Sequence, residues 1–193
     1  MQTEDEKIAQ KLKDVGVNVV SVYDLVNTSM PYPSAIPILL DALQTGISHS
    51  GTKEGVIRAL TVKEAKGKAA PVLIQEFYRT TNPILRWTIG NAMTMVATDN
   101  DFAEIVKIIE DQENGDARQM FVFALGNFKN GRSESILLSL LKKNDLPGHA
   151  IRALEKLRSE KARNYLISYQ THPVAWIRRA ATRALKKLDK LQK

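Results

Sequence analysis

The sequence predicts an all-α fold, a right-handed α–α superhelix of about five helix pairs preceded by an N-terminal helical cap. Three observations predict it. Two independent sets of apolar segments each recur with a period of about thirty residues. Within the segments, apolar residues follow the 3.6-residue spacing of helices, and no stretch shows the sustained alternation of a strand. Turn-forming residues such as Asn, Gly and Pro separate the segments.

Residues 1–30 are expected to form the cap. Thr3 can cap a first helix that has one apolar face and ends at Gly16. The segment from Ser21 to Asp24 resembles a capping box in which the shorter Asp replaces Glu. Stacked repeats need a polar end, so we expect this cap to precede one continuous repeat domain over residues 31–193.

Each expected pair begins with an amphipathic helix and continues with a second helix. The first helices have equivalent positions 29 to 34 residues apart, at Pro37, Pro71, Ile105, Ile136 and Tyr165. The second helices carry a shared apolar motif, whose last residues lie 29 to 33 positions apart, at Leu60, Met93, Leu125, Leu154 and Leu185. Two markers with one period indicate a stack of similar hairpins.

The helix pairs resemble HEAT repeats, above all the short repeats of phycobilisome-lyase-like bacterial proteins. A Pro in the first helix and an Arg followed by an Ala-Leu pattern in the second carry the resemblance, and residues 176–185 are its best instance. It covers about residues 31–188. The resemblance implies a solenoid that binds other macromolecules, without specifying which.

The sequence departs from the family pattern at the opening of two second helices. Lys53 and Pro147 stand where the other pairs have Arg86, Arg118 and Arg178. The resemblance implies that this Arg ties neighbouring turns together, so we expect looser junctions at Lys53 and Pro147.

The second helices have a predicted core face and a predicted solvent face, which lines the concave surface in HEAT stacks. Towards the middle of the stack the solvent face is apolar, with Trp87, Met95, Met120 and Phe123. Exposed aromatic and Met side chains are favoured anchors for partners. The candidate site comprises these four residues with Arg58, Asn91 and Arg152. The alternative is that the apolar side chains fill the crevices between adjacent second helices.

Charge is uneven along the chain. Residues 1–131 hold 13 Lys and Arg against 16 Asp and Glu, whereas residues 132–193 hold 15 against 5. A second candidate site, for an anionic partner, lies on the last helix and comprises Arg178, Arg179, Arg183, Lys186 and Lys187. The alternative is a solvated end cap whose cations interact with the helix dipole.

Several kinds of chemistry lack their motifs. The chain has no Cys, and its three His lie in different repeats without metal-ligand spacing. Phosphate-binding loops and a nucleophile elbow are absent from the sequence. We therefore expect no catalytic residue, metal, cofactor or small-molecule substrate. The polar N-terminus and the lack of long apolar runs predict a cytoplasmic protein without a membrane partner.

The sequence is compatible with three functions. The first is a non-catalytic scaffold that binds a protein or peptide on its concave face. The second is a nucleic-acid-binding protein that uses the basic C-terminal repeats. The third comes from a resemblance to the HEAT-like DNA glycosylases for alkylated bases, which Trp87, Trp176 and the Arg178–Arg179 pair invite. No acidic residue occupies a second-helix solvent position near either Trp.

Overall fold

The computed structural model describes residues 2–190, and every regular element in that range is a helix. The chain forms two compact units, unit 1 (Met1–Lys107) and unit 2 (Ile108–Lys193). Within each, successive helices pack side by side in chain order, which confirms the predicted α-solenoid architecture. None of the described helices is long and apolar enough to span a bilayer.

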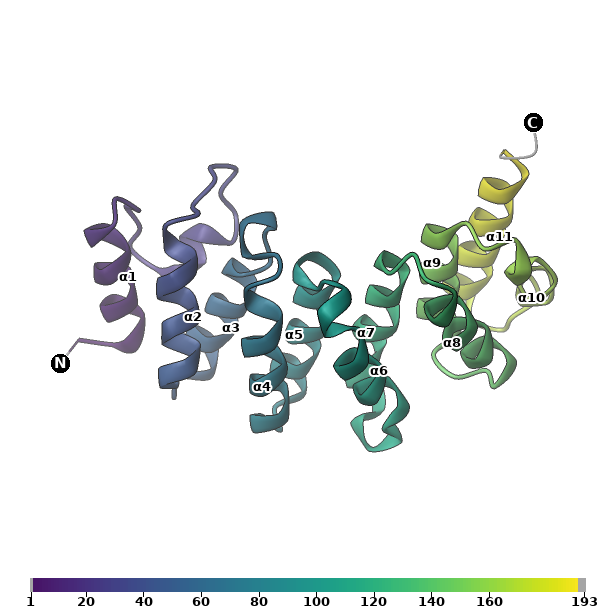
Figure 1. Cartoon of the computed structure of the whole chain (residues 1–193), viewed down its shortest axis with the longest axis horizontal. Coiled ribbons are helices and arrows are strands. Elements are labelled where there is room, and N and C mark those ends of the chain that lie inside the picture. Colours follow the sequence, from purple (N-terminus) through teal and green to yellow (C-terminus); the bar gives the residue numbers. More distant parts are fainter. Residues whose placement is uncertain (1, 191–193) are drawn as a thin grey trace. The chain divides into compact units, whose positions relative to one another are not determined.

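Unit 1 contains the cap and the first two helix pairs (Figure 1). The cap consists of α1 (Glu4–Asp14) and the 3-10 turn η1 (Val22–Leu25). The pairs are α2 (Ala35–Thr45) with α3 (Ser50–Ala59), and α4 (Ala69–Arg79) with α5 (Pro83–Val96). The 3-10 turns η2 (Lys63–Ala65) and η3 (Asp99–Asp101) precede α4 and α6 (Phe102–Glu110), and α6 crosses the boundary between the units.

Both predicted caps are present. The Thr3 hydroxyl accepts from the Glu6 amide at 3.2 Å, while the Glu6 carboxylate accepts from the Thr3 amide at 2.9 Å. The shorter Asp24 serves the second box, where its carboxylate accepts from the amides of Val20 and Ser21. Because these bonds satisfy amides that no helical carbonyl can reach, they fix the start of α1 and of η1.

Unit 1 is built in two layers. The first helices α2 and α4 pack together, and the second helices α3 and α5 pack together, with α1 against α2 (Figure 1). Between the layers lies a core of fully buried side chains, which include Val56, Ile57, Leu60, Ile89 and Met93. These are predicted core positions of the second helices, so the 3.6-residue spacing identified the buried face correctly.

The cap also covers part of α3. Gly55 occupies a predicted solvent position but is buried. A Cβ atom at Gly55 would lie 2.7 Å from the Val22 side chain and 2.9 Å from the Tyr23 ring. The absence of a side chain at Gly55 therefore lets η1 lie directly on α3.

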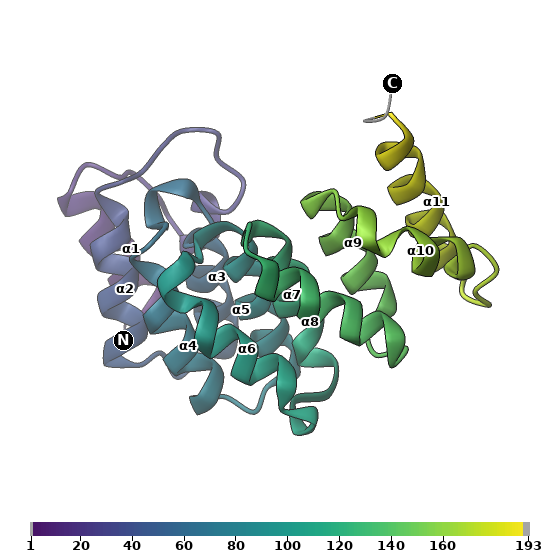
Figure 2. The same cartoon turned by 45° about the vertical axis from the view of Figure 1, so that its right-hand side comes forward.

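Unit 2 contains the end of α6 and two and a half further pairs. The 3-10 segments η4 (Gln112–Arg118) and η5 (Leu125–Asn127) flank α7 (Gln119–Ala124). The following pairs are α8 (Gly131–Lys142) with α9 (Pro147–Leu157), and α10 (Arg163–Tyr169) with α11 (Ala175–Asp189); η6 (Glu160–Ala162) leads into α10. Figure 2 shows α10 lying against α11.

The second helices of unit 2 form one layer in which α9 packs against both α7 and α11. A Cβ atom at Gly126 would lie 3.0 Å from the Ala153 backbone, so Gly126 permits the close approach of η5 to α9. The large core residues include Phe121, Leu137, Ile151 and Leu166. The single repeat domain over residues 31–193 stays a prediction.

Candidate partner-binding surface

One face of α5 carries three of the predicted site residues. Asn82 caps this helix by accepting from the Ile84 and Leu85 amides, and Pro83 follows at the first helical position, where it has the required φ. Trp87 and Met95 are each 39% exposed, and Asn91 between them is half-buried. The crevice-filling alternative does not describe Trp87 and Met95, because more than a third of the surface of each residue is open to solvent.

This face includes one more residue, which was not among the predicted site residues. Ile84 lies three positions before Trp87, which is within one helical face, and it is 60% exposed. Its spacing from Trp87, Asn91 and Met95 was the available signal, but the predicted solvent face did not include it. We call Ile84, Trp87, Asn91 and Met95 the α5 stripe.

Arg58 belongs to the neighbouring second helix, α3. Its guanidinium donates to the Glu54 carboxylate at 2.7 and 2.8 Å, one helical turn away, and both side chains are half-buried. Since α3 packs against α5, this ion pair lies in the same layer as the α5 stripe.

The other predicted apolar residues lie in unit 2. Met120 is only 8% exposed and Phe123 is half-buried. The exposed Arg152 guanidinium lies 4.4 Å from the centre of the Phe123 ring, in cation–π geometry. Phe123 and Arg152 are thus brought together, whereas Met120 contributes little surface.

Arg118 makes the tie to the next pair that the resemblance implied for its position. Arg118 is buried, donates to the carbonyls of Gly115 and Ile109, and makes two 2.9 Å bonds to the Asp145 carboxylate. These bonds lower the pKa of Asp145. Asp145 lies just before α9, so this pair fastens the junction at which Pro147 replaces the usual Arg.

The expectation of a looser junction at Lys53 is wrong. Its ammonium group donates to Glu76 at 2.6 Å, and Glu76, on α4, is only 3% exposed. Lys53 therefore ties α3 to α4, the first helix of the next pair.

The Trp176 ring packs against the start of α9 within unit 2. A Cβ atom at Gly148 would lie 1.8 Å from the Trp176 ring, so the indole occupies the space that a side chain would need. The His149 ring meets the same indole edge-on at 5.5 Å between centroids. Burial, with a smaller contribution from Arg152, lowers the pKa of His149, so this ring is neutral at pH 7.

The predicted basic patch on α11 divides into two groups. Arg178 donates to the carbonyls of His172 and Pro173, and Arg183 and Lys187 interact with Glu155 of α9. Arg179 and Lys186 are exposed and have no carboxylate partner within residues 2–190. Trp176 and Arg178, which invited the glycosylase comparison, thus make internal contacts.

The family model of HEAT repeats matches residues 102–186, a segment that contains the pairs from α6 to α11. Residues 102–186 therefore form HEAT repeats. A comparison with curated proteins gives no match. HEAT repeats stack into extended scaffolds for interactions with other proteins. Within residues 2–190, no three His, Asp or Glu side chains are grouped as a metal-binding set.

Proposed function

We propose that this protein is a non-catalytic scaffold that binds a protein or peptide on the solvent face of its second helices. The observation that carries the proposal is the α5 stripe. Ile84, Trp87 and Met95 expose 60%, 39% and 39% of their surface on one helix face. Apolar side chains that adjoin one another on a surface are the usual sign of an interaction site.

The residue types fit a binding role. Trp is the residue most often found to dominate binding energy, and Met adapts to irregular apolar partners. Asn91 supplies amide hydrogen-bonding groups between them. We assign Arg58 a flanking role, in which it adds orientation and encounter rate more than affinity.

Phe123, Met120 and Arg152 form the second part of the proposed surface, in unit 2. The guanidinium of Arg152 over the Phe123 ring gives an amphipathic contact that can meet an aromatic or acidic group. Met120, being buried, supports Phe123 in the proposal rather than touching the partner. The proposed setting is the cytoplasm.

Site-specific photo-crosslinking in the native cell tests the proposal. A photoreactive residue replaces Asn91 in the stripe, and a matched control replaces Gln75, an exposed residue of α4. We expect a discrete adduct of higher mass from position 91 only. The double substitution Trp87→Ala, Met95→Ala should abolish that adduct.

Thermal unfolding of the same double variant distinguishes the loss of a binding surface from the loss of the fold. Because both side chains are partly exposed, their loss should shift the thermal unfolding midpoint by no more than a few degrees. An unfolded variant would mean that Trp87 and Met95 belong to the core. Equal crosslinking from positions 91 and 75 would mean that α5 carries no selective surface.

The charge of unit 2 favours a second candidate function, the binding of nucleic acid. Unit 2 has 17 Lys and Arg against 9 Asp and Glu, whereas unit 1 has 11 against 12. Phosphate contacts release counterions, so affinity for a DNA or RNA oligonucleotide would fall steeply with salt. Substituting Arg179 and Lys186 by Ala should then flatten this slope. A shallow slope in the original protein would reject the candidate.

A further inference from the structure

The second helices of unit 2 present two exposed Arg side chains that lack a counter-charge. These are Arg152 on α9 and Arg179 on α11. Neither pairs with a carboxylate in residues 2–190. A guanidinium carries five N–H donors in a planar fork that matches a carboxylate, and it keeps its charge at physiological pH. The two side chains therefore offer donors and positive charge to a partner.

Contacts between α9 and α11 place these two Arg at the same level of the layer. The Trp176 ring lies over Gly148, and Arg183 donates to Glu155 at 2.9 Å. Both contacts join residues that are 28 positions apart, so the two helices run in the same direction in a constant register. The Arg of α11 is then level with the residue that precedes the Arg of α9. Packed helices have axes about 8–10 Å apart, which sets the separation of the two Arg positions.

An aromatic ring lies beside each of the two Arg. The Arg152 guanidinium lies 4.4 Å from the centre of the half-buried Phe123 ring of α7. Trp176 lies three positions before Arg179, on the same face of α11, and is 40% exposed. Its ring tip fills the space above Gly148, so the indole is held in place before a partner binds. We call Phe123, Arg152, Trp176 and Arg179 the Arg–aromatic surface.

The charges that border this surface leave it positive. Arg183 and Lys187 share the single carboxylate of Glu155. On the α7 side, the Asp116 carboxylate accepts from the Gln119 side-chain amide at 3.0 Å. With the two Arg of the surface, this gives four cations against two carboxylates. An anionic partner would therefore be attracted to the surface.

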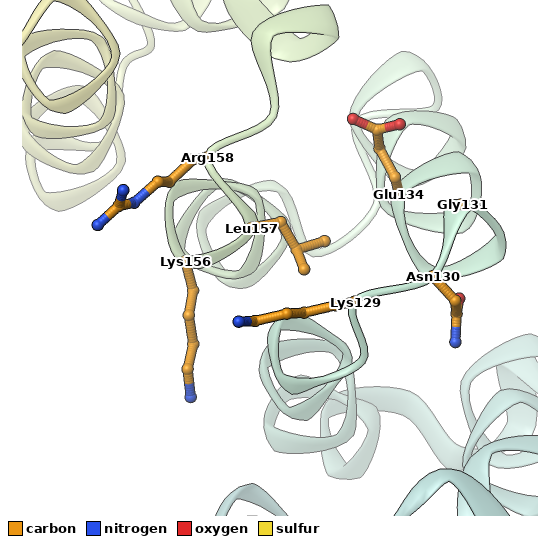
Figure 3. A pocket seen from close by; sticks show the side chains of 7 residues that line it. All are labelled: Lys129, Asn130, Gly131, Glu134, Lys156, Leu157 and Arg158. Carbon is orange, nitrogen blue, oxygen red and sulfur yellow. The ribbon is translucent and has the colours of Figure 1, made fainter. Parts of the chain in front are cut away.

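The cations around the end of α9 do not extend the surface. They line a cleft of about 610 Å³ where α8 begins and α9 ends. In Figure 3, the side chains of Lys129, Lys156 and Arg158 point in different directions. These three cations do not face one ligand, so the Arg–aromatic surface is confined to the first turns of α9 and α11 and the adjoining part of α7.

We propose that the Arg–aromatic surface binds an acidic segment of a partner protein, in which Asp or Glu residues stand next to apolar residues. Each guanidinium donates two parallel hydrogen bonds to a carboxylate, and the ring beside it covers the adjoining apolar side chain. Trp and Arg are the residue types that most often dominate binding energy. The inference rests on the proposed function, because it names the chemistry of a partner that the scaffold holds.

The spacing of α9 and α11 determines the spacing of the acidic residues. A polyproline II segment has three residues per turn and rises about 3.1 Å per residue, so side chains three positions apart lie on one side, about 9 Å from each other. This matches the separation of about 8–10 Å between packed helices. The partner segment therefore carries two acidic residues three positions apart.

The surroundings favour a peptide over a nucleic acid. The carboxylates of Glu155 and Asp116 border the Arg–aromatic surface on its two sides. A nucleic-acid strand has a negative phosphate at every nucleotide, so it would bring phosphates against both carboxylates. A peptide can instead place its two acidic side chains at the two Arg and neutral residues elsewhere.

Fluorescence anisotropy with labelled peptides tests the proposal. The probe is a ten-residue peptide of Gly and Ser that carries two Glu three positions apart, each followed by Phe. Its matched forms have Gln in place of both Glu, or Ser in place of both Phe. The full chain should bind the Glu–Phe peptide at least tenfold more tightly than either matched form. Equal affinity for either matched form, no measurable binding of the Glu–Phe peptide, or tighter binding of a labelled ten-nucleotide single-stranded DNA would overturn the proposal.

Substitutions of the two Arg connect peptide binding to this surface. Arg152→Gln and Arg179→Gln should each lower the affinity for the Glu–Phe peptide at least fivefold. Lys142→Gln, which removes an exposed charge from α8, should leave the affinity unchanged. Arg152→Gln also removes the contact with Phe123, so its thermal unfolding midpoint is measured in parallel. Arg179 has no ion pair to lose within residues 2–190, and unchanged affinity in either Arg variant would overturn the proposal.

Two results keep this inference distinct from the proposed function. Trp87→Ala, Met95→Ala should leave binding of the Glu–Phe peptide unchanged, since the α5 stripe belongs to unit 1 and the Arg–aromatic surface to unit 2. If the peptide binds no better than its Gln form, the acidic partner is rejected, while the crosslinking from position 91 still decides the scaffold proposal on its own.

Discussion

Two glycines show how single residues set the packing of this solenoid. Gly55 and Gly148 occupy predicted solvent positions of α3 and α9, yet both are buried. In each case an aromatic side chain from another segment takes the place of a missing side chain, Tyr23 over Gly55 and Trp176 over Gly148. At Gly55 and at Gly148, the solvent face of the second helix is thus covered, because the missing side chain leaves room for a neighbouring segment.

Gly148→Ala should destabilise unit 2. The new Cβ atom would lie 1.8 Å from the Trp176 ring, so the indole must move out of its site. Overpacking of this kind costs about 1–3 kcal/mol in the free energy of unfolding. Urea unfolding measures the loss. Gly131→Ala is the matched control, because nothing lies within 4 Å of its Cβ position, and it should change stability little.

A second substitution checks the cause of that loss. If the indole is the obstacle, replacing Trp176 by the smaller Leu in the Gly148→Ala background should restore part of the lost stability. A further loss of stability in the double variant would show that the indole is not the obstacle, and that position 148 requires Gly for its backbone conformation.

At this scale, local patterns were predictable and contacts between distant residues were not. The caps at Thr3 and Ser21 depend on neighbours three residues away, which the sequence displays. The burial of Gly148 depends on a residue 28 positions later, and periodicity along one helix carries no information about such a partner. Met120 illustrates the same limit, because its position on the predicted solvent face did not reveal its burial.

At the scale of the elements, the junctions between helix pairs depend on charged side chains that cross from one pair to the next. Arg118 reaches Asp145 at the start of α9, and Lys53 reaches Glu76 on α4. In each junction one partner is nearly inaccessible to water. Removing the other partner therefore leaves a buried charge without compensation.

Asp145→Asn should lower the free energy of unfolding by about 2–4 kcal/mol at pH 7, because Arg118 loses its counter-charge. The effect should depend on pH. Arg118 holds the pKa of Asp145 below its ordinary value in the folded protein, so its stabilisation is complete above the unfolded pKa, near 4. The stabilisation is lost as pH falls through the lowered, folded pKa.

Urea unfolding of both proteins at pH 7 and at pH 3 checks this sign. The difference between the original protein and Asp145→Asn should be smaller at pH 3. Comparing the two proteins removes the contribution of other carboxyl groups with lowered pKa values, such as Glu134 and Asp24. A difference that grows in acid would contradict the assigned direction.

Lys53→Ala should cost about 2–4 kcal/mol in the free energy of unfolding, because it leaves the buried Glu76 carboxylate unpaired. The double variant Lys53→Ala, Glu76→Gln should recover part of this loss, since no charge then remains buried. Urea unfolding of the four proteins of this cycle gives the coupling energy. A coupling near zero would show that the two side chains act independently.

The sequence predicted the helix pairs and their core faces because both follow from spacing within one helix. It misjudged Lys53, since the Arg pattern of the family does not indicate that a Lys can reach a carboxylate on the next first helix. It did not indicate the left-handed backbone of Arg158 at the end of α9 either, because Gly or Asn is expected at such a position.

For the molecule as a whole, the two units differ in chemical character. Unit 1 carries the exposed apolar stripe of α5 and nearly balanced charge, whereas unit 2 carries the whole net excess of Lys and Arg over Asp and Glu. In a stack of repeats, each hairpin is stabilised mainly by its neighbours. A local perturbation is therefore expected to spread over adjacent hairpins and to fade with distance along the chain.

Hydrogen exchange of two glycine variants tests that expectation. Gly148→Ala should accelerate amide exchange most in α8–α11, and Gly55→Ala should do so most in η1, α2 and α3, because each new Cβ atom displaces a contact within its own unit. If each variant instead accelerates exchange equally in both units, residues 31–193 unfold as one cooperative domain. That outcome would favour the continuous domain expected from the sequence, since only a fully cooperative stack transmits a local strain of 1–3 kcal/mol to every amide alike.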